Sequence, residues 1–375
     1  MIFLFIIPLF CFLLITVYLF LLHHYHIEFN RIPETDSGNP DPVNVSVIIP
    51  ARNEEKNIGA CLDSLLAQDY PPAETEIIVA DDHSDDRTAS IVNSRGIRLV
   101  SLDIKHGETN AFKKMALTKA IELSKGGLIM TTDADCTVPP RWISTIVHAQ
   151  QSTGAVFIVA PVRMRYGKSF LSKFQSLDFA ILQGITAASV HSGFHHMANG
   201  ANLAYTREAF NSVNGFSGID DIASGDDMLL MHKISAAFPG KTTYAFSSEA
   251  IVETLPEQDW KSFFRQRIRW ASKARRYEDK RIFRVLLFVY VLNLSMLVLI
   301  CTAFLSTTHL SLCLLMLFYK TIVEWGFVRT VLSFFGLSKL LRWFPVSQPV
   351  HIIYTVISGL FGQAGTYQWK GRQVK

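Results

Sequence analysis

The chain has 375 residues, 49% of them hydrophobic, and a formal net charge of +4 at pH 7. Much of this apolar share lies in a few blocks near the two ends of the chain, which argues against a wholly soluble protein. Lys and Arg cluster between Lys261 and Arg284, just before an apolar block, which is typical of a juxtamembrane segment and not of a nucleic-acid-binding patch. The five cysteines show no pairing or zinc spacing, which favours a reducing compartment.

The first 25 residues are a predicted transmembrane anchor. Residues 2–22 are almost purely apolar and long enough to cross a bilayer. They lack the basic start and small-residue cleavage site of a signal peptide, so we expect the anchor to be retained. Residues 26–43 form a linker that contains a run rich in Pro, Gly, Asp and Asn.

The next hundred or so residues alternate between short apolar runs and helical patterns. Strands are expected at 45–50, 76–80, 98–102 and 127–131, with helices following the first three. This alternation predicts an α/β fold with a doubly wound, mostly parallel sheet.

Charged residues follow three of these strands, where ligands bind in an open α/β sheet. They are Arg52-Asn53-Glu54, Asp81-Asp82 and Asp133-Ala134-Asp135. Two carboxylates one residue apart repel each other, and a divalent cation (Mg²⁺ or Mn²⁺) relieves the repulsion and leaves sites for substrate phosphates. An alternative is that Asp133 and Asp135 cap the helix expected after Pro139 and Pro140.

In order and spacing, these motifs resemble the nucleotide-binding half of a family 2 glycosyltransferase, whose fold is the nucleotide-sugar-binding type A fold. The similarity covers about residues 45–270. It implies that Asp133 and Asp135 hold the metal and that the nucleotide-sugar donor contacts Asp133 as well as Pro50, Arg52, Glu54, Asp81 and Asp82. Lys113 resembles a donor-contacting lysine of the family, although Phe112 and Thr118 replace the family's glycine and asparagine; a solvated helix residue is the alternative.

The second half of the domain carries the expected acceptor side. We predict a strand at 155–164 and a long helix near the membrane at 169–190. The segment 199–207 resembles the family's glycine-containing strand, so Gly200 is expected near the acceptor, with a β-bulge as the alternative. In Ser224-Gly225-Asp226-Asp227, at a helix start, the resemblance makes Asp227 the catalytic base and Asp226 the next candidate; capping explains one of the two acids.

Residues 266–270 complete a Gln-x-x-Arg-Trp signature on a helix predicted at about 258–277. The spacing places Gln266, Arg269 and Trp270 on one helical face. The resemblance implies that Gln266 and Arg269 contact the diphosphate of the donor and that Trp270 contacts the acceptor. An amphipathic helix lying on the membrane surface explains the same pattern.

Two further spans are expected, at 285–305 and at about 310–331, where Lys320 and Glu324 can pair on one helical face. The block 350–361 is too short to span. The predicted organisation is therefore an anchor (1–25), a linker (26–43), a catalytic domain (44–257, with a nucleotide-sugar half at 44–150 and an acceptor half at 151–257), an interfacial helix (258–284) and a membrane region of two or three helices (285–365).

We expect an inverting enzyme that moves a sugar from a nucleotide donor, UDP-linked by family default, to a membrane lipid acceptor. A processive polysaccharide synthase subunit and a catalytically inactive membrane scaffold remain alternatives. A nucleotidyltransferase of the same fold would carry a Gly-rich basic loop after its first strand, where this chain has Pro50-Ala51-Arg52-Asn53-Glu54. Basic residues flanking the spans predict an integral protein of the cell (inner) membrane with a cytoplasmic catalytic domain.

Overall fold

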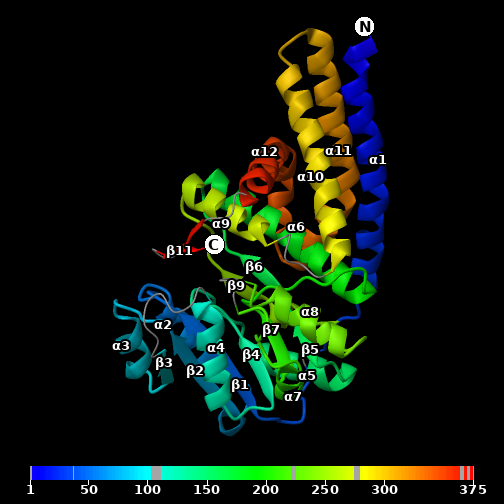
Figure 1. Ribbon diagram of the computed structural model, residues 1–375. Coiled ribbons are helices and arrows are strands. Elements are labelled where there is room, and N and C mark those ends of the chain that lie inside the picture. Colours follow the sequence, from blue (N-terminus) through cyan, green and yellow to red (C-terminus); the bar gives the residue numbers. More distant parts are fainter. Residues whose placement is uncertain are drawn as a thin grey trace. The chain divides into compact units, whose positions relative to one another are not determined.

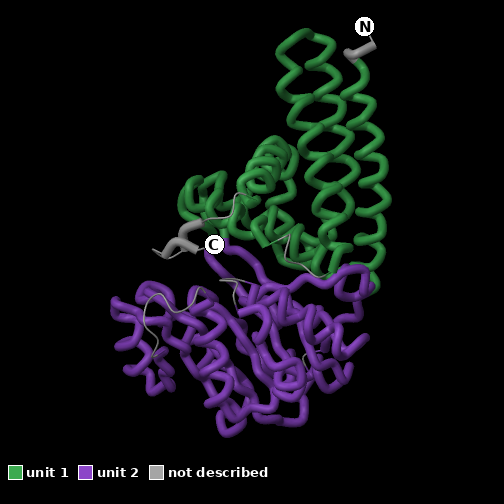
Figure 2. The backbone as a smooth tube through the Cα atoms, in the orientation of Figure 1, with its two compact units in different colours: residues 1–31, 166–188, 256–367 green, residues 32–165, 189–255, 368–375 purple. Residues whose placement is uncertain are grey.

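The computed structural model describes residues 2–36, 38–102, 111–220, 225–273, 279–363, 367–369 and 372–374. The chain divides into two compact units, coloured separately in Figure 2. Unit 1 comprises residues 1–31, 166–188 and 256–367, and unit 2 comprises residues 32–165, 189–255 and 368–375. Ser224 and Tyr277, which belong to predicted motifs or helices, lie outside the described residues.

Unit 2 is an α/β domain whose seven-stranded sheet, within the described residues, has the order β3-β2-β1-β4-β7-β5-β8. β1 to β4 are mutually parallel and β7 is antiparallel to β4 and β5, which confirms the predicted mostly parallel sheet. The strands are β1 (Val45–Ala51), β2 (Thr75–Asp81), β3 (Arg98–Ser101), β4 (Leu128–Thr131), β5 (Phe157–Val159), β6 (Val162–Met164), β7 (Leu203–Thr206), β8 (Thr242–Tyr244) and β9 (Val252–Thr254).

Helices cover this sheet, so its central strands read as continuous apolar runs. All four residues of β4 are buried. In Figure 1, α4 lies along β1 and β2, and α5 lies beside β5. The helices of unit 2 are α2 (Ile58–Leu66), α3 (Thr88–Ser94), α4 (Phe112–Leu123), α5 (Trp142–Thr153), α7 (Arg207–Ser212), α8 (Met228–Ala237), η1 (Pro72–Glu74) and η2 (Ser248–Ala250).

The single strand predicted at 155–164 is wrong. The chain forms β5 and β6 on either side of Ala160 and Pro161. Pro161 has no N–H to continue a ladder, and its carbonyl accepts a hydrogen bond from Val252 N instead. The shorter β6 then pairs with β9 in a separate two-stranded sheet.

The reversed direction of β7 positions the candidate site. Its first residue, Leu203, pairs with Thr131, the last residue of β4. The chain just before β7 therefore lies at the edge where the parallel strands end. Asn202 is fully buried there, and its side chain bonds to the carbonyls of Pro161 and Ala250 and to Trp142 Nε1. This network fixes the turn that carries Gly200.

Unit 1 is helical, and four of the described helices are long and apolar enough to cross a membrane: 5–31, Lys280–Thr302, Thr307–Phe334 and Ser338–Gly362. α1, α10 and α11 lie side by side (Figure 1), with side chains such as Phe20 and Phe318 more than 60% exposed. The helices are α1 (Ile2–Arg31), α6 (Phe170–Ser192, which ends in unit 2), α9 (Trp260–Ser272), α10 (Lys280–Thr302), α11 (Thr307–Phe334), η4 (Ser338–Trp343) and α12 (Phe344–Gly362).

Two features of unit 1 differ from the sequence prediction. Residues 166–188 group with this unit, because the apolar face of α6 packs on α9: Phe174 contacts Trp260, and Phe179 contacts Trp270. The block at 350–361 is part of a helix of 19 residues, so the prediction that it is too short to span a membrane is wrong.

The predicted pairing of Lys320 with Glu324 is confirmed, at 2.6 Å, and Lys320 also donates to Gln348 of α12. At the C-terminus, β10 (Tyr367–Trp369) pairs with β11 (Arg372–Val374).

Candidate active site

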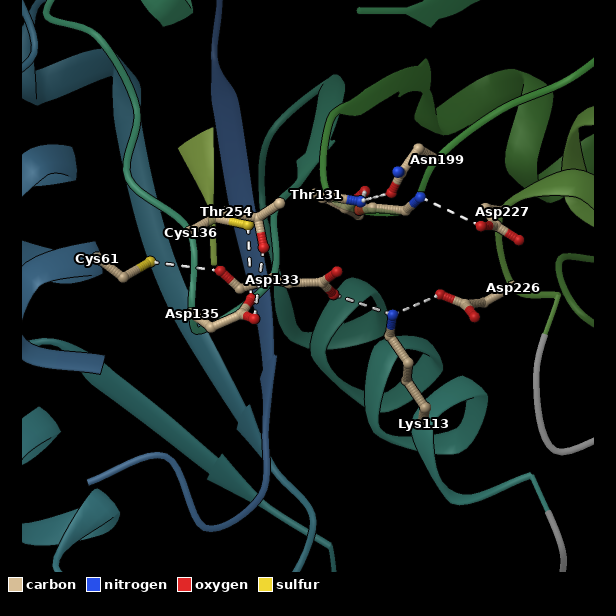
Figure 3. Close-up of polar contacts among 12 residues, drawn as sticks. Cys61, Lys113, Thr131, Asp133, Asp135, Cys136, Asn199, Asp226, Asp227 and Thr254 are labelled. Carbon is tan, nitrogen blue, oxygen red and sulfur yellow. Dashed lines mark hydrogen bonds and ion pairs between the residues drawn. The ribbon is translucent and has the colours of Figure 1, made fainter. Parts of the chain in front are cut away.

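Lys113 links the two acidic motifs of unit 2. Its Nζ atom lies 3.1 Å from Asp133 Oδ1 and 2.9 Å from Asp226 Oδ2, and Figure 3 shows it between the two carboxylates. Burial alone would lower the pKa of Lys113, but the charges of Asp133 and Asp226 outweigh it and raise the pKa above its ordinary value. Lys113 thus remains a cation held by two carboxylates, and the solvated-helix alternative is wrong.

Asp227 and Gly200 meet beside this ion pair. Asp227, labelled in Figure 3, accepts a hydrogen bond at Oδ2 from Gly200 N at 3.3 Å. Its Oδ1 accepts one from Met228 N at 2.8 Å, at the start of α8. Asp227 is therefore the acid that caps the helix. Gly200 lies in a turn before β7, not inside a strand or bulge. A Cβ atom on Gly200 would lie 3.3 Å from Asp226 Oδ2 and 3.5 Å from Lys113 Nζ.

Asp135 lies in a different environment from Asp133. Thr254 Oγ1 donates to Asp135 Oδ2 at 3.5 Å, and Cys136 Sγ lies 3.6 Å from Asp135 Oδ1. Burial and the nearby carboxylates raise the pKa of the Cys136 and Cys61 thiols, so both stay neutral. The capping alternative for these acids is wrong, because α5 has no side-chain cap.

The loops after β1 and β2 are joined by hydrogen bonds. Arg52 Nη1 donates to the backbone oxygen of Asp82 at 2.8 Å and lies 3.6 Å from its carboxylate. Asn53 and His83 both have a φ of 53°, a left-handed conformation that costs energy and is typical of functional loops. Asp81 is 5% exposed, and its Oδ1 atom has no hydrogen-bond partner among the described residues.

The other two predicted donor residues lie on the same loop. Pro50 pairs with Ala80 of β2, beyond the point where β1 pairs with β4, so its missing N–H breaks no ladder on that side. Glu54 N donates to Thr88 Oγ1 at 2.8 Å, and Glu54 Oε2 accepts from Asn57 Nδ2 at 3.0 Å.

The Gln-x-x-Arg-Trp residues belong to unit 1. Gln266, Arg269 and Trp270 are half-buried on α9, which starts with a capping box formed by Asp259 and Ser262. Gln266 Nε2 donates to Glu257 Oε1 at 3.0 Å. The buried member of this motif is Arg267, which the sequence analysis passed over.

The acidic pair fits a hard divalent cation by its donor chemistry. Mg²⁺ and Mn²⁺ prefer carboxylate oxygens, and Mg²⁺ is held by one or two carboxylates together with substrate phosphates. The described residues include no cluster of three or more His, Cys, Asp or Glu side chains suited to a metal. Asp133 and Asp135 therefore suit a cation shared with a diphosphate better than an all-protein metal cage.

Comparison with known proteins identifies the sheet domain. Residues 46–213 match the model of glycosyl transferase family 2. This segment is a family 2 glycosyltransferase domain. The chain is also similar to a solved structure titled as the mannosyltransferase PcManGT from Pyrobaculum calidifontis in complex with GDP-Man and Mn²⁺, with a TM-score of 0.59 and 19% identity over 95% of this chain and 99% of that one. That likeness supports the type A fold of the glycosyltransferase domain.

Curated relatives of the glycosyltransferase domain differ in what their names say. Bacillus subtilis (strain 168) YdaM, named a probable glycosyltransferase, is 30% identical over 66% of this chain and 59% of its own length. A poly-beta-1,6-N-acetyl-D-glucosamine synthase of Staphylococcus epidermidis is 25% identical over 65% and 58%. A Synechocystis beta-monoglucosyldiacylglycerol synthase is 24% identical over 46% and 37%. The chain thus spans less than two thirds of these relatives.

Besides Arg267, sequence reasoning missed three side chains that contact residues of the predicted motifs. Thr254 and Cys136 contact Asp135. Thr254 comes from a distant strand, so no local sequence signal links it to Asp135, whereas Cys136 directly follows Asp135 in the chain. Asp178 on α6 is buried next to Arg267 of the signature helix. Its signal was available: it is the only acidic residue in the helix predicted at 169–190.

Proposed function

We propose that this protein is an inverting glycosyltransferase that moves a sugar from a nucleotide-sugar donor to a membrane lipid. The observation that carries the proposal is the bridge from Asp133 through Lys113 to Asp226, the neighbour of Asp227, at the carboxyl edge of the sheet. It joins a metal- and phosphate-binding motif to a candidate base in a family 2 domain.

Asp81 is proposed to bind the nucleobase. A buried carboxylate oxygen without a partner among the described residues is costly, so a hydrogen-bond donor from a bound ligand or a water molecule would stabilise it. Uracil, thymine and guanine carry a ring N–H that can supply it, whereas the equivalent ring nitrogens of cytosine and adenine are acceptors. Arg52 holds Asp82 beside it. This chemistry supports a sugar donor whose nucleobase has a ring N–H, such as a uridine or guanosine diphosphate sugar, with UDP as the first candidate.

Asp135 and Asp133 are proposed to hold Mg²⁺ or Mn²⁺. When bound, the cation would offset negative charge on the nucleoside diphosphate leaving group. Lys113 places a second positive charge beside Asp133. Gln266 and Arg269 are proposed to contact the diphosphate, a task that suits the planar fork of arginine, and Trp270 to contact the acceptor.

Asp227 is proposed as the general base. Its carboxylate takes the proton of the acceptor hydroxyl as that oxygen bonds to the anomeric carbon, and the bond from this carbon to the diphosphate breaks on the opposite face. The hydrogen bonds from Gly200 N and Met228 N hold the carboxylate in one orientation. Asp226, paired with Lys113, is the next candidate.

A lipid acceptor is supported by the beta-monoglucosyldiacylglycerol synthase among the relatives, and the apolar surface of unit 1 would hold the enzyme beside membrane lipids. Large side chains on α1 and α11 are exposed, which suits contact with lipid. We propose that these helices anchor the protein in the cell (inner) membrane, with the catalytic domain in the cytoplasm. A processive synthase of exopolysaccharide or cell-envelope glycan is the second candidate, supported by the poly-N-acetylglucosamine synthase among the relatives. An inactive scaffold is disfavoured, since the three acidic motifs are intact.

Transfer assays on the full chain in lipid nanodiscs test the proposal. Protein with Mn²⁺ is incubated with UDP-, GDP-, CDP- and ADP-linked radiolabelled sugars and membrane lipids, and the products are separated into lipid extract and polymer. We expect label in the lipid extract with a UDP or GDP donor. Label in polymer would favour the synthase, and no transfer from any donor would favour the scaffold.

Nucleotide binding by the Asp81→Asn variant separately tests whether Asp81 binds the nucleobase. The amide replaces an acceptor with a donor at the same position, so affinity for the preferred nucleoside diphosphate should fall about tenfold or more. Unchanged affinity would remove Asp81 from the nucleobase site.

A further inference from the structure

A buried carboxylate joins three helices of unit 1. Asp178 on α6 is 8% exposed. Its Oδ1 accepts from His351 Nδ1 of α12 at 2.9 Å, and both its oxygens lie 2.9 Å from the hydroxyl of Tyr354 of α12. Arg267 Nη2 of α9 lies 3.3 Å from Asp178 Oδ2. Desolvation alone would raise the pKa of Asp178, but His351, Arg267 and Tyr354 lower it below its ordinary value, so the group is charged.

Arg267 is enclosed by rings. Its guanidinium carbon lies 4.2 Å from the centroid of Trp270, 5.1 Å from that of Phe263 and 5.8 Å from that of Tyr354. The side chain is 4% exposed, and its Nε and Nη2 atoms have no hydrogen bond among the described residues. Asp178 therefore compensates the charge of Arg267, while Trp270 supplies the closest face on which the guanidinium stacks.

The arrangement is poorly explained by stability alone. Removing two charges from water is costly, and a well-packed apolar pair in their place is often as stable or more stable. What an apolar pair cannot do is hold a planar cation against one particular indole ring. Phe179, the neighbour of Asp178 on α6, also contacts Trp270, with ring centroids 6.0 Å apart. Trp270 is thus contacted by Arg267 from its own helix, α9, and by Phe179 from α6.

We propose that Asp178 and Arg267 are positioning residues for Trp270 and, through α9, for Gln266 and Arg269. Asp178 holds the Arg267 guanidinium, and the stacked guanidinium fixes the rotamer of Trp270. Because His351 and Tyr354 lie on α12, the same carboxylate fastens the signature helix to a helix of the membrane region. The inference rests on the proposed function, since it assumes that Trp270 and its neighbours contact substrate.

A double-mutant cycle separates positioning from simple structural support. Asp178→Asn, Trp270→Phe and the double variant are compared in kcat and in the KM of donor and acceptor. Asp178→Asn should lower kcat about tenfold to a hundredfold, as expected for a displaced contact group. If Asp178 acts through Trp270, the double variant will resemble the worse single variant. Multiplicative losses would overturn the proposal.

Glu324→Gln is the matched control. It alters another buried ion pair among the described residues of unit 1, formed by Glu324 and Lys320 of α11, whose Nζ atom also donates to Gln348 of α12. In a double variant with Trp270→Phe, the fold losses in kcat of the two single variants should multiply, because Glu324 does not act through Trp270. If Asp178→Asn does not fold, Arg267→Lys takes its place in the cycle: the charge beside Asp178 is kept and the planar stack on Trp270 is lost. Normal kcat in Arg267→Lys would also overturn the proposal.

Hydrogen exchange gives a readout that does not need activity. Amides of α9, residues 260–272, should exchange faster in Asp178→Asn than in the parent protein, while those of α2 in unit 2 should not change. Unchanged exchange in α9 would refute the fastening role. If the parent protein transfers no sugar and binds no nucleotide, the proposed function fails, yet the exchange result still decides whether Asp178 holds α9.

Discussion

Gly200 N donates a hydrogen bond to Asp227 Oδ2 across 3.3 Å, so the turn before β7 directly orients the candidate base. The same glycine leaves room for the Lys113–Asp226 ion pair, because a Cβ atom would come within 3.3 Å of Asp226 Oδ2. One residue thus sets the spacing between the candidate base and the ion pair that connects it to Asp133 of the proposed metal-binding motif.

Gly200→Ala should disturb this spacing without straining the backbone. The neighbouring side chains must move by a few tenths of an ångström, and we expect kcat to fall about tenfold to a hundredfold, since small misplacements near reacting groups are costly. Steady-state transfer kinetics measure the loss. Gly127→Ala is the matched control, because a Cβ atom there meets nothing within 4 Å. Equal kcat in the two variants would remove Gly200 from the site.

Asp227→Asn keeps the size of the side chain and one of its two acceptor oxygens but removes its basicity. We expect kcat to fall by about two to four orders of magnitude, with little change in the affinity for a nucleoside diphosphate measured by calorimetry. Asp226→Asn serves as the comparison. A greater loss of kcat in Asp226→Asn than in Asp227→Asn would transfer the role of base to Asp226.

Asp135→Ala should abolish the increase in nucleotide affinity that Mn²⁺ produces, because a cation bridging carboxylate and phosphate loses its protein ligand. Calorimetry with UDP or GDP, with and without Mn²⁺, measures the difference. Asp63→Ala is the control: it removes the same charge from the surface of unit 2, where Asp63 pairs with Arg95. A metal effect that survives in Asp135→Ala contradicts the assignment.

The C-terminus is expected on the cytoplasmic side, as the basic residues near it indicate. α12 would then be re-entrant or interfacial, even though it is long enough to be a candidate span. In a protein with Cys301 replaced by serine, Lys375→Cys should react with a membrane-impermeant maleimide only after cells are opened. Ser306→Cys, in the loop between α10 and α11, should react in intact cells, and Glu208→Cys should not. Labelling of Lys375→Cys in intact cells would mean that α12 crosses the membrane.

Local sequence patterns predicted the nucleotide half of the fold well. β1, β2 and β4 lie where the apolar runs place them, and each is followed by its charged motif. Each of these strands can be recognised from its own apolar residues and from the charged residues that follow it. The break at Pro161 was also readable from the missing N–H of proline.

Contacts between distant segments could not be predicted in this way. The bridge from Lys113 to Asp226 exists only because β7 runs antiparallel to β4 and returns the chain to the same edge of the sheet. Thr254 reaches Asp135 because its neighbour in β9, Glu253, forms an antiparallel bridge with Thr137. The grouping of α6 with unit 1 depends on aromatic packing between segments about 90 residues apart, such as Phe179 and Trp270.

The antiparallel β7 also sets an order for folding. β4 is fully buried and lies between β1 and β7, so until Leu203–Thr206 has been synthesised one edge of an apolar strand is unpaired. Exposed apolar strand edges recruit other chains and lead to aggregation. The nucleotide half therefore cannot complete its sheet by itself during translation, and truncations that end before Thr206 should be insoluble even though they retain β1 to β4.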